Sequence, residues 1–490
     1  MVNGRNLRRA GCEALVALLG TSNVYVPGST GYNSSIASYF SPQAAAVRPA
    51  CYVTPQSAQD VATAIKSLTS TDNGGPHDFA VRAGGHTWFA DSNSSPGGVT
   101  LDLRGLKSIS LSDDKSTVSV GPGATWDLVY NQLDPLGLSV AGGRVSGVGV
   151  GGLTLGGGIS YFGPREGWTC NQAVAFEVVL ANGTIVEANE TENADLWWGL
   201  RGGSNNLGIV TRIDLRTFEQ GNLWYSMTFN LLSEADKLAE IYANIMAPEN
   251  YDVNASYLTG WAYAATQGLS VTLNQLVYTR PQGNETPAYF QPILDLPSVP
   301  TPISGTVIGN MSALAAQSAT MQVPQAAQYM TATITFEPTE AMIKETYAAF
   351  NASLPQIKNV TGISWALNLE PLPPQIYTNG GADTNALGLT NENGRSLVVC
   401  LISPSWSNAA QNDQVYAAAR ALLDDIASRA KTLGVYDPYI YLNYAAPWQD
   451  VIQSYGADNV KKLQQIRARV DPKKIFTKKV TGGFKIPDSC

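Results

Sequence analysis

The feature that most constrains this chain is a glycine-rich stretch between Gly142 and Gly158. Its second half, GVGVGGLTLGGG at 147–158, alternates glycine with apolar residues. Val148, Val150 and Leu153 are too apolar to be left in water, which argues against a free linker. Because glycine lets the backbone approach a ligand closely, the pattern favours a loop that lies against a large flat ring system.

A second glycine motif, RAGGHT at 82–87, contains His86, and the only other histidine in the 490 residues is His77. Consecutive amides in a Gly-Gly turn form a concave nest that suits a pyrophosphate. Two histidines cannot build a His-rich metal site, and a Ser-His-Asp or Cys-His arrangement would have to use one of them. We therefore expect no metal and a different role for His86. Neither glycine stretch has the lysine of a P-loop or the context of a doubly wound dinucleotide fingerprint.

Composition bounds the class of protein. A chain of 490 residues with 44% hydrophobic and 14% charged residues is long enough for two or three folded domains. A net charge of −8 and a pI near 5.0 argue against a nucleic-acid partner. No apolar run has the length needed to cross a bilayer, so we expect no integral membrane protein. We expect a monomer that acts on a small molecule.

Hydrophobic periodicity divides the chain into three parts. Residues 1–218 read as one α+β unit with short strands and a helix at 57–70, and an Asn182-Gly183 turn predicts a hairpin there. Residues 219–434 have longer elements and predict an antiparallel sheet backed by helices, with strands at 269–278, 330–336, 363–369 and 396–402 and helices at 339–352 and 408–433. The tail, 435–490, is too short to stand alone and must dock on another part.

Cysteine usage and glycosylation signals suggest an oxidising compartment. The five cysteines include no C-x-x-C pair, and Cys12 and Cys51 flank a segment that a disulfide could attach to the domain. We predict that bridge. Nine Asn-x-Ser/Thr acceptors favour a secreted protein whose signal peptide is absent from the numbered sequence, at Asn33, Asn93, Asn182, Asn189, Asn254, Asn284, Asn310, Asn351 and Asn359.

Several motifs in order along the chain resemble a known family. RAGGHT at 82–87, AGGRVSGVGVGGLTLGGGISYFGPREGW at 141–168 and NADLWWGLRGGSNNLGIVTR at 193–212 resemble FAD-linked oxidases of the vanillyl-alcohol oxidase superfamily. YLNYAAPW at 441–448 and DPKKIF at 471–476 resemble the fungal members of its berberine-bridge-enzyme-like branch. The resemblance implies a two-subdomain PCMH-type FAD-binding domain at 1–218, an α+β substrate domain at 219–434, and a C-terminal segment at 435–490 that returns to the FAD domain.

The resemblance also implies how FAD is held. In this family the histidine of the Gly-Gly-His turn, here His86, carries the flavin through a covalent bond to its 8α-methyl group. Many relatives add a cysteinyl link at the position of Val145, so we expect a single attachment. The further cofactor-binding positions are Arg82, Ala83, Gly84, Gly85 and Thr87 at the diphosphate, Gly149, Gly151, Gly152, Gly156 and Gly157 along the flavin, Gly208, Ile209 and Val210 near the adenosine, and Asn443 on the flavin.

Catalysis by a flavin enzyme needs a base for the proton that accompanies hydride loss. The resemblance points to the Tyr-x-Asn-Tyr element, in which Tyr444 or Tyr441 is the base or a substrate anchor; Glu370 is a second candidate. A phenol with a pKa near 10 is a poor base unless its surroundings lower that value. Val148 matches a gatekeeper position that admits oxygen to the reduced flavin, although Leu153 and Asn171 depart from the pattern of oxygen-reactive relatives.

These expectations define a FAD-dependent oxidase. It would take a hydride from an alcohol, an amine or an activated C–H bond and pass the electrons to O2 to give hydrogen peroxide. We expect a fungal secondary metabolite as substrate. Two alternatives stay open at this point: an oligosaccharide oxidase, and a flavin-bearing isomerase or cyclase with no net oxidation.

Overall fold

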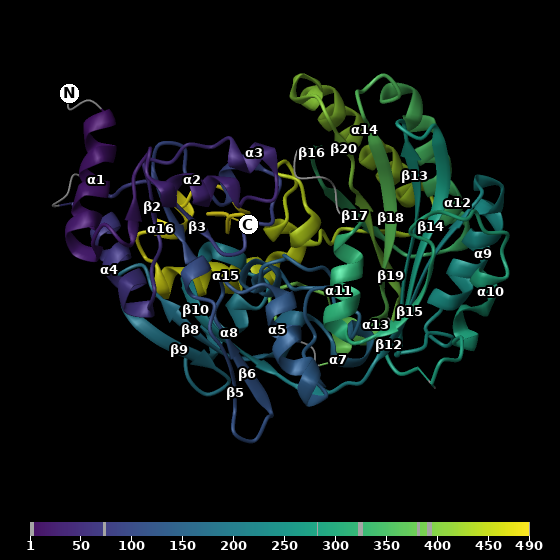
Figure 1. Cartoon of the computed structure of the whole chain (residues 1–490), viewed down its shortest axis with the longest axis horizontal. Helices are drawn as coiled ribbons and strands as arrows, with labels where there is room; N and C mark the ends of the chain where they lie inside the picture. The colour runs from purple at the N-terminus through teal and green to yellow at the C-terminus, as the bar shows by residue number, and fades with distance from the viewer. Residues whose placement is uncertain are drawn as a thin grey trace.

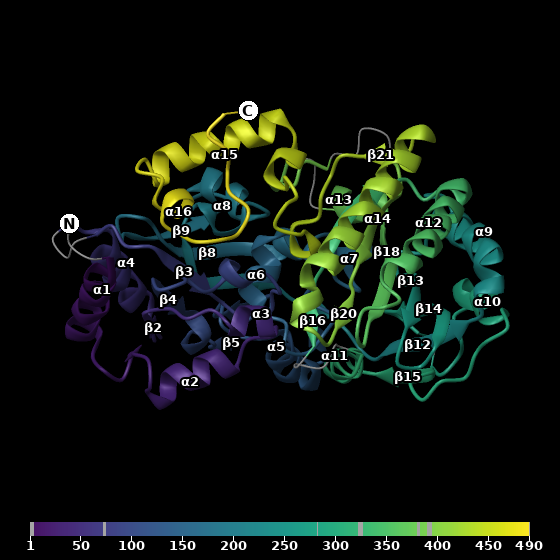
Figure 2. The ribbon, with the colours of Figure 1, turned by 90° about the horizontal axis from the view of Figure 1, so that it is seen from above.

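The computed structural model describes residues 4–71, 75–281, 283–321, 327–379, 383–389 and 394–489. Two small α+β units from the N-terminal half lie beside one large sheet from the middle of the chain, and the C-terminal segment crosses back over the small units (Figures 1 and 2). This is the predicted α+β architecture.

The first small unit is built on a four-stranded sheet. Its order is β1-β2-β4-β3, formed by Val24–Tyr25, Cys51–Val53, Val99–Asp102 and Phe79–Arg82. The strands β2, β4 and β3 run parallel, as their helical crossover connections require. Helix α4, Ala58–Thr69, lies within the stretch predicted as helical, and Ser57 caps its start by accepting a hydrogen bond from the Asp60 amide.

The second small unit is an antiparallel five-stranded sheet. Its order is β5-β6-β10-β8-β9, formed by Ile109–Leu111, Thr117–Val120, Ile209–Arg216, Ala173–Val179 and Ile185–Asn189. The predicted hairpin is β8 and β9. Helices α5, Trp126–Leu133, and α8, Ala194–Leu200, belong to this unit.

The large sheet has ten strands in antiparallel pairs. The order along its main path is β15-β12-β14-β13-β18-β19-β17-β21, with β16 and β20 beside it, formed by Gly305–Gly309, Leu223–Asn230, Leu269–Tyr278, Ala255–Ala264, Ser364–Leu372, Leu397–Ile402, Ala332–Phe336, Tyr436–Asp437, Gln328–Tyr329 and Ser405–Trp406. The predicted boundaries shift slightly: β11, Phe218–Glu219, still pairs with β7, Leu138–Ser139, in the N-terminal half. Strand β21 belongs to this sheet and precedes the returning tail.

Both faces of the large sheet are buried. Helices α9, Ala235–Met246, α12, Glu340–Ser353, and α14, Asn412–Thr432, lie on the side away from the small units (Figure 2). Val398 and Cys400 of β19 pack into the core under these helices. Val399, which alternates with them, packs into the core shared with the small units. Successive side chains of β19 point to opposite faces of the sheet, and each face meets a hydrophobic layer. The strand is therefore apolar throughout.

The tail returns to the small units as predicted. Helix α15, Ala457–Val470, lies against α8, and Arg469 forms an ion pair with Asp195 there. After the short α16, Ile475–Lys478, Val480 forms a parallel bridge with Phe79 at β3. The last described residues then loop back to end beside α15 (Figure 2).

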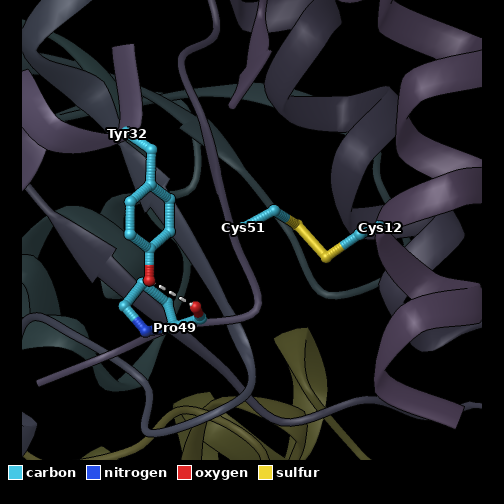
Figure 3. Close-up of a disulfide and its surroundings, with 4 residues drawn as sticks. All are labelled: Cys12, Tyr32, Pro49 and Cys51. Carbon is cyan, nitrogen blue, oxygen red and sulfur yellow. Dashed lines mark hydrogen bonds between the residues drawn. A yellow bond between two sulfur atoms is a disulfide. The ribbon is translucent and has the colours of Figure 1, made fainter. Parts of the chain in front are cut away.

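The predicted disulfide is present. Cys12 of α1, Gly4–Leu19, bonds to Cys51 at the start of β2, and both lie in the core of the first unit (Figure 3). Nearby, Tyr32 donates a hydrogen bond of 2.8 Å to the Pro49 carbonyl, which holds the segment between the two cysteines (Figure 3).

Within the described residues, no helix combines the length and the apolar character that a membrane span needs.

The second glycine stretch, predicted as a loop, contains a short helix, α6, at Val150–Leu155. Val150 and Thr154, one turn apart, are both fully buried on one side of α6, so the apolar residues of the stretch are accommodated by a helical turn.

Candidate active site

His86 lies in a turn that follows β3, at the junction of the small units and the large sheet. Its ring stacks on Phe40 with 3.9 Å between ring centroids, and Phe40 in turn meets Tyr329 of β16 edge-on. Gly85 has φ +76°, a left-handed conformation that favours glycine. Burial lowers the pKa of His86 to about 4, so the imidazole is neutral at physiological pH.

The side chain of Arg82 supports this turn from below. It is fully buried and donates hydrogen bonds of 2.8 Å to the carbonyls of Ser35 and Ser38, with the Asp102 carboxylate at 3.6 Å. It also lies over the ring of Tyr39. The guanidinium is thus engaged with protein groups, and the part of the RAGGHT motif that remains for a ligand is its backbone, with Ala83 and Thr87.

The two glycine stretches predicted to hold one cofactor are in direct contact. A Cβ atom added to Gly149 would lie 2.6 Å from the Cα of Gly84. A Cβ atom added to Gly151 would likewise lie 3.1 Å from the Cβ of Ala83. Gly152, by contrast, faces open space with nothing within 4 Å of an added Cβ. The site therefore combines a tight backbone junction with an open glycine surface.

The end of the second stretch meets the returning tail. A Cβ on Gly156 would lie 2.2 Å from Oδ1 of Asn443, and Gly157 has φ +104°. Asn443 donates hydrogen bonds to the Leu153 carbonyl at 3.0 Å and to the Tyr441 hydroxyl at 3.1 Å. Asn443 thus joins the tail to α6.

Val145 and Val148 occupy the loop that leads into α6. Both are partly buried, and the Val148 amide donates a hydrogen bond to the Val145 carbonyl at 3.4 Å. The remaining free cysteines in the described part of the chain, Cys170 and Cys400, are buried. Burial raises the pKa of the Cys170 thiol to about 12, which makes it a poor nucleophile.

The three positions assigned to the adenosine half lie at the start of β10. Ile209 and Val210 are buried and pair with Val179 and Val178 of β8. A Cβ on Gly208 would lie 2.4 Å from a methyl group of Val178. Close strand packing therefore accounts for the glycine at this position.

Tyr444 and Glu370, predicted as alternative bases, meet in one buried network. Tyr444 comes from the tail and Glu370 from β18, and the Tyr444 hydroxyl donates to Oε2 of Glu370 at 3.2 Å. Arg144 completes the network: its Nη1 lies 2.5 Å from Oε1 of Glu370, and its Nη2 donates to the Tyr444 hydroxyl at 2.5 Å. Three distant chain segments thus place a cation, a carboxylate and a phenol together.

The electrostatics of this network separate the roles of its members. Burial raises the pKa of Tyr444 well above its usual value, and the charge of Arg144 only partly opposes that shift. Burial disfavours the charged form of Arg144, but the Glu370 carboxylate overrides it and leaves the pKa well above the usual value. Glu370 is 1% exposed and its charge is balanced by Arg144. The phenol is protonated and the carboxylate is the acceptor.

Tyr441 has different surroundings from Tyr444. Its hydroxyl accepts hydrogen bonds from the Ile159 amide at 3.0 Å and from Asn443, and its ring stacks on Trp168. Burial raises the pKa of Tyr441 to about 12. These contacts fix the end of the glycine stretch, which is a positioning role.

The sequence did not single out Arg144, nor the polar group beside it. Arg144 lies 5.8 Å from the centre of the Tyr161 ring, whose hydroxyl accepts a 2.7 Å hydrogen bond from Gln275 of β14. Gln275 also reaches Ser318 of α11, Met311–Ala319. The sequence feature that could have identified this network is Arg144 itself, because it is a lone cation inside a glycine-rich apolar stretch.

These residues fit FAD. The two glycine stretches meet at Gly84 and Gly149, and Gly152 leaves open space beside them. His86 is neutral, and the tail brings Asn443 to the end of the second stretch and Tyr444 to Glu370. FAD needs close backbone approach along its rings and a site for hydride transfer from which water is largely excluded. The glycine contacts and the buried Glu370 meet these needs.

Comparisons with known proteins agree with this geometry. A family profile described as an FAD binding domain matches residues 49–189, which include His86 and the second glycine stretch. FAD-dependent monooxygenase CTB5 of Cercospora beticola is 34% identical over 487 residues, covering 97% of this chain and 91% of that protein. FAD-dependent monooxygenase drtC of Aspergillus calidoustus is 32% identical over 482 residues, with 97% and 90% covered.

A third relative is matched over only part of its length. Oligopeptidase PhomG' of Diaporthe leptostromiformis is 41% identical over 484 residues, which cover 97% of this chain but 37% of that protein. Most of that protein lies outside the match, so its name describes a much longer chain.

Solved structures share the fold. Berberine bridge enzyme, in a variant bound to (S)-reticuline, has a TM-score of 0.78 at 17% identity, covering 98% of this chain and 99% of that one. Xylooligosaccharide oxidase from Myceliophthora thermophila C1, bound to xylobiose, has a TM-score of 0.76 at 20% identity, covering 97% and 99%. The site and these matches define an FAD-dependent oxidoreductase. The chain belongs to a family of FAD-dependent oxidoreductases that includes the fungal FAD-dependent monooxygenases CTB5 and drtC, and it shares the fold of berberine bridge enzyme.

Proposed function

We propose that this protein is an oxidase that removes a hydride and a proton from a small-molecule alcohol, amine or activated C–H compound, on a fungal secondary-metabolite scaffold. The single observation that carries the proposal is the hydrogen-bonded network of Arg144, Glu370 and Tyr444 beside the flavin-binding glycines. FAD, when bound, supplies the two-electron chemistry: it accepts the hydride and is reoxidised by O2 to give hydrogen peroxide.

The protein residues have distinct tasks in this reaction. A substrate O–H or N–H donates to the Tyr444 hydroxyl, which passes its own proton to Oε2 of Glu370 over 3.2 Å. Arg144 holds both acceptors in place and stabilises the carboxylate before the proton arrives. The large sheet and the tail bury Glu370, and they leave Arg144 and Tyr444 partly exposed, where a substrate can reach the phenol.

We also propose a single covalent attachment of FAD through His86. A neutral imidazole retains the lone pair that must form the bond to the 8α carbon, and the lowered pKa of His86 keeps it neutral. Val145 provides no sulfur, and the buried Cys170 has a raised pKa. A mass spectrum of a protease digest should carry one FAD, on the peptide that contains His86. FAD on any cysteine peptide would contradict the single link.

A second candidate reaction comes from the names of the relatives. Two fungal relatives at 34% and 32% identity are called monooxygenases, so the oxygen atom could enter the product instead of leaving as peroxide. Turnover under heavy-isotope O2 separates the two: the oxidase releases peroxide stoichiometrically and leaves the product unlabelled, whereas a monooxygenase labels it.

The experiment that tests the proposed reaction is a substrate panel read by peroxide release and by anaerobic flavin bleaching. Phenolic and benzylic alcohols should bleach the flavin, and sugars should not. Bleaching by oligosaccharides instead would establish the sugar-oxidase alternative. Product formed without O2 consumption and without bleaching would establish the isomerase or cyclase alternative and overturn the oxidase.

We further propose that the chain folds in the secretory pathway, which the Cys12–Cys51 disulfide supports. Exposed acceptors such as Asn33, Asn182, Asn351 and Asn359 should then carry glycans, while Asn93, which is 7% exposed, should not. Glycopeptide mapping after secretion by a fungal host checks this pattern, and absence of all glycans would contradict it.

A further inference from the structure

The last described residues pass between two segments that adjoin, in the chain, the positions predicted to hold opposite ends of FAD. On one side is η1, Ala90–Ser92, which closely follows His86: a Cβ on Gly482 would lie 2.2 Å from the Asp91 carbonyl oxygen. On the other side is η5, Ser204–Asn206, which precedes Gly208: a Cβ on Gly483 would lie 2.8 Å from Oδ1 of Asn205. No side chain larger than hydrogen fits at either glycine without movement.

The side chain of Asn206 holds the backbone of this C-terminal segment in place. Its Nδ2 donates to the Phe484 carbonyl at 2.8 Å and its Oδ1 accepts from the Ile486 amide at 3.1 Å. The ring of Phe484 also packs edge-on against Phe89, three residues after His86. The residue between the two hydrogen bonds, Lys485, is therefore placed by the fold and is not part of a loose terminus.

Lys485 differs from the other partnered lysines of the tail. Lys474 pairs with Asp488 at 2.7 Å and Lys479 pairs with Asp78 at 3.2 Å. Among the residues that the structure describes, no carboxylate lies within 4 Å of the Lys485 ammonium, and its hydrogen-bond partner is the amide oxygen of Asn205 at 3.4 Å. Burial lowers the pKa of Lys485 to about 7. A half-buried ammonium without a nearby carboxylate is costly, and an anionic ligand would remove that cost.

The Gly-Gly turn, which precedes η1 in the chain, lacks a free cation of its own. Arg82, the cation of the RAGGHT motif, is engaged by Asp102 and the carbonyls of Ser35 and Ser38. A diphosphate carries negative charge that backbone dipoles alone balance only in part. We propose that the ammonium group of Lys485 binds the diphosphate of FAD, between the His86 turn and the segment that leads to Gly208.

This assignment gives the C-terminal segment a second task beside the placement of Tyr444. The tail supplies both a reacting hydroxyl at the flavin end and a positive charge at the diphosphate. It concerns how FAD is bound, so it holds whichever reaction the site performs.

The test compares ligands with and without the diphosphate. The background is full-length His86→Ala protein, in which the proposed histidyl bond to flavin cannot form. FAD and riboflavin are titrated by fluorescence into chains that also carry Lys485→Met, Lys485→Arg or, as the control, Lys473→Met at an exposed position. We expect Lys485→Met to raise the Kd for FAD about tenfold or more, as loss of one charge-assisted contact does. Riboflavin affinity should not change, Lys485→Arg should recover most of the FAD affinity, and Lys473→Met should match the parent.

Two outcomes would overturn the assignment. Either Lys485→Met leaves the FAD Kd within about twofold of the parent, or it weakens FAD and riboflavin equally, which would indicate a general change of the pocket. If Lys485→Met does not fold, a second measurement that leaves Lys485 unchanged tests the same contact. Amine labelling of Lys485 in the flavin-free protein should be blocked by FAD and not by riboflavin; equal labelling with both would contradict the contact.

Discussion

Tyr444 donates a hydrogen bond to Glu370, with 3.2 Å between the phenol oxygen and Oε2 of the carboxylate. The two residues come from the tail and from β18, so only the return of the tail onto the large sheet creates the pair. Since burial holds the phenol protonated, a proton that leaves the substrate ends on the carboxylate. In the proposed reaction Tyr444 is then a relay and Glu370 the final acceptor.

The first prediction concerns Glu370→Gln, which keeps the size of the side chain and removes its basicity. We expect the rate of flavin reduction by substrate to fall by about a hundredfold or more, as loss of a general base does, with unchanged flavin content. Stopped-flow reduction under anaerobic conditions measures this rate. The control is Glu345→Gln on α12, where the carboxylate is 46% exposed and pairs with Arg429. Full turnover in Glu370→Gln, or in Tyr444→Phe, would dismiss the relay.

The second prediction concerns His86→Ala. Without the imidazole the flavin should be released by acid or denaturant, whereas the parent protein should keep its flavin colour after the same treatment. Activity should fall together with flavin content and should be partly restored by added FAD, because the glycine contacts of the pocket remain. Retention of flavin on the denatured variant would show that another residue carries the bond.

Much of the fold could be predicted from local patterns. The stretches predicted as helices at 57–70 and 408–433 contain α4 and α14, and the stretch at 339–352 matches α12 to within one residue at its end, because each has an apolar face at helical spacing. Strands β12 and β13 were missed. The sequence of β13, ASYLTGWAYA, mixes glycine, alanine and hydroxyl residues, so its tendency to form a strand becomes visible only when β14 and β18 pair with it.

The site was predicted in pieces but not as a network. Motif resemblance located Tyr444, and a place at the end of a predicted strand located Glu370. The two were competing candidates because sequence distance hides their contact. Arg144 escaped notice for the same reason: its two partners lie 226 and 300 residues away along the chain. Short-range motifs report the backbone that holds a cofactor, whereas side-chain networks depend on long-range packing.

The third prediction concerns the pH dependence of stability in the flavin-free protein. The pKa of His86 is about 4 in the folded chain, below its usual value of 6.5, so the unfolded chain binds the proton more readily. Stability from this group is therefore complete above pH 6.5 and is lost as the pH falls. The loss should amount to about 3 kcal/mol at pH 4. Urea unfolding at pH 7 and pH 4 measures it, with His86→Gln as the reference that lacks this term. Equal losses in both proteins would contradict a buried neutral imidazole.

The last prediction concerns the contact between the two glycine stretches. In Gly149→Ala the new methyl group would lie 2.6 Å from the Gly84 Cα and 2.7 Å from its nitrogen. Neither atom can move as a flexible side chain could, so the His86 turn and the loop before α6 must separate. We expect a loss of about 1–3 kcal/mol in the free energy of unfolding and a lower flavin-to-protein ratio. The control, Gly221→Ala, adds its methyl group to open space and should change stability by less than about 1 kcal/mol. Denaturant unfolding and flavin absorbance give the two readouts. If Gly149→Ala matched Gly221→Ala in both, the close backbone contact would not be what holds the cofactor turn in place.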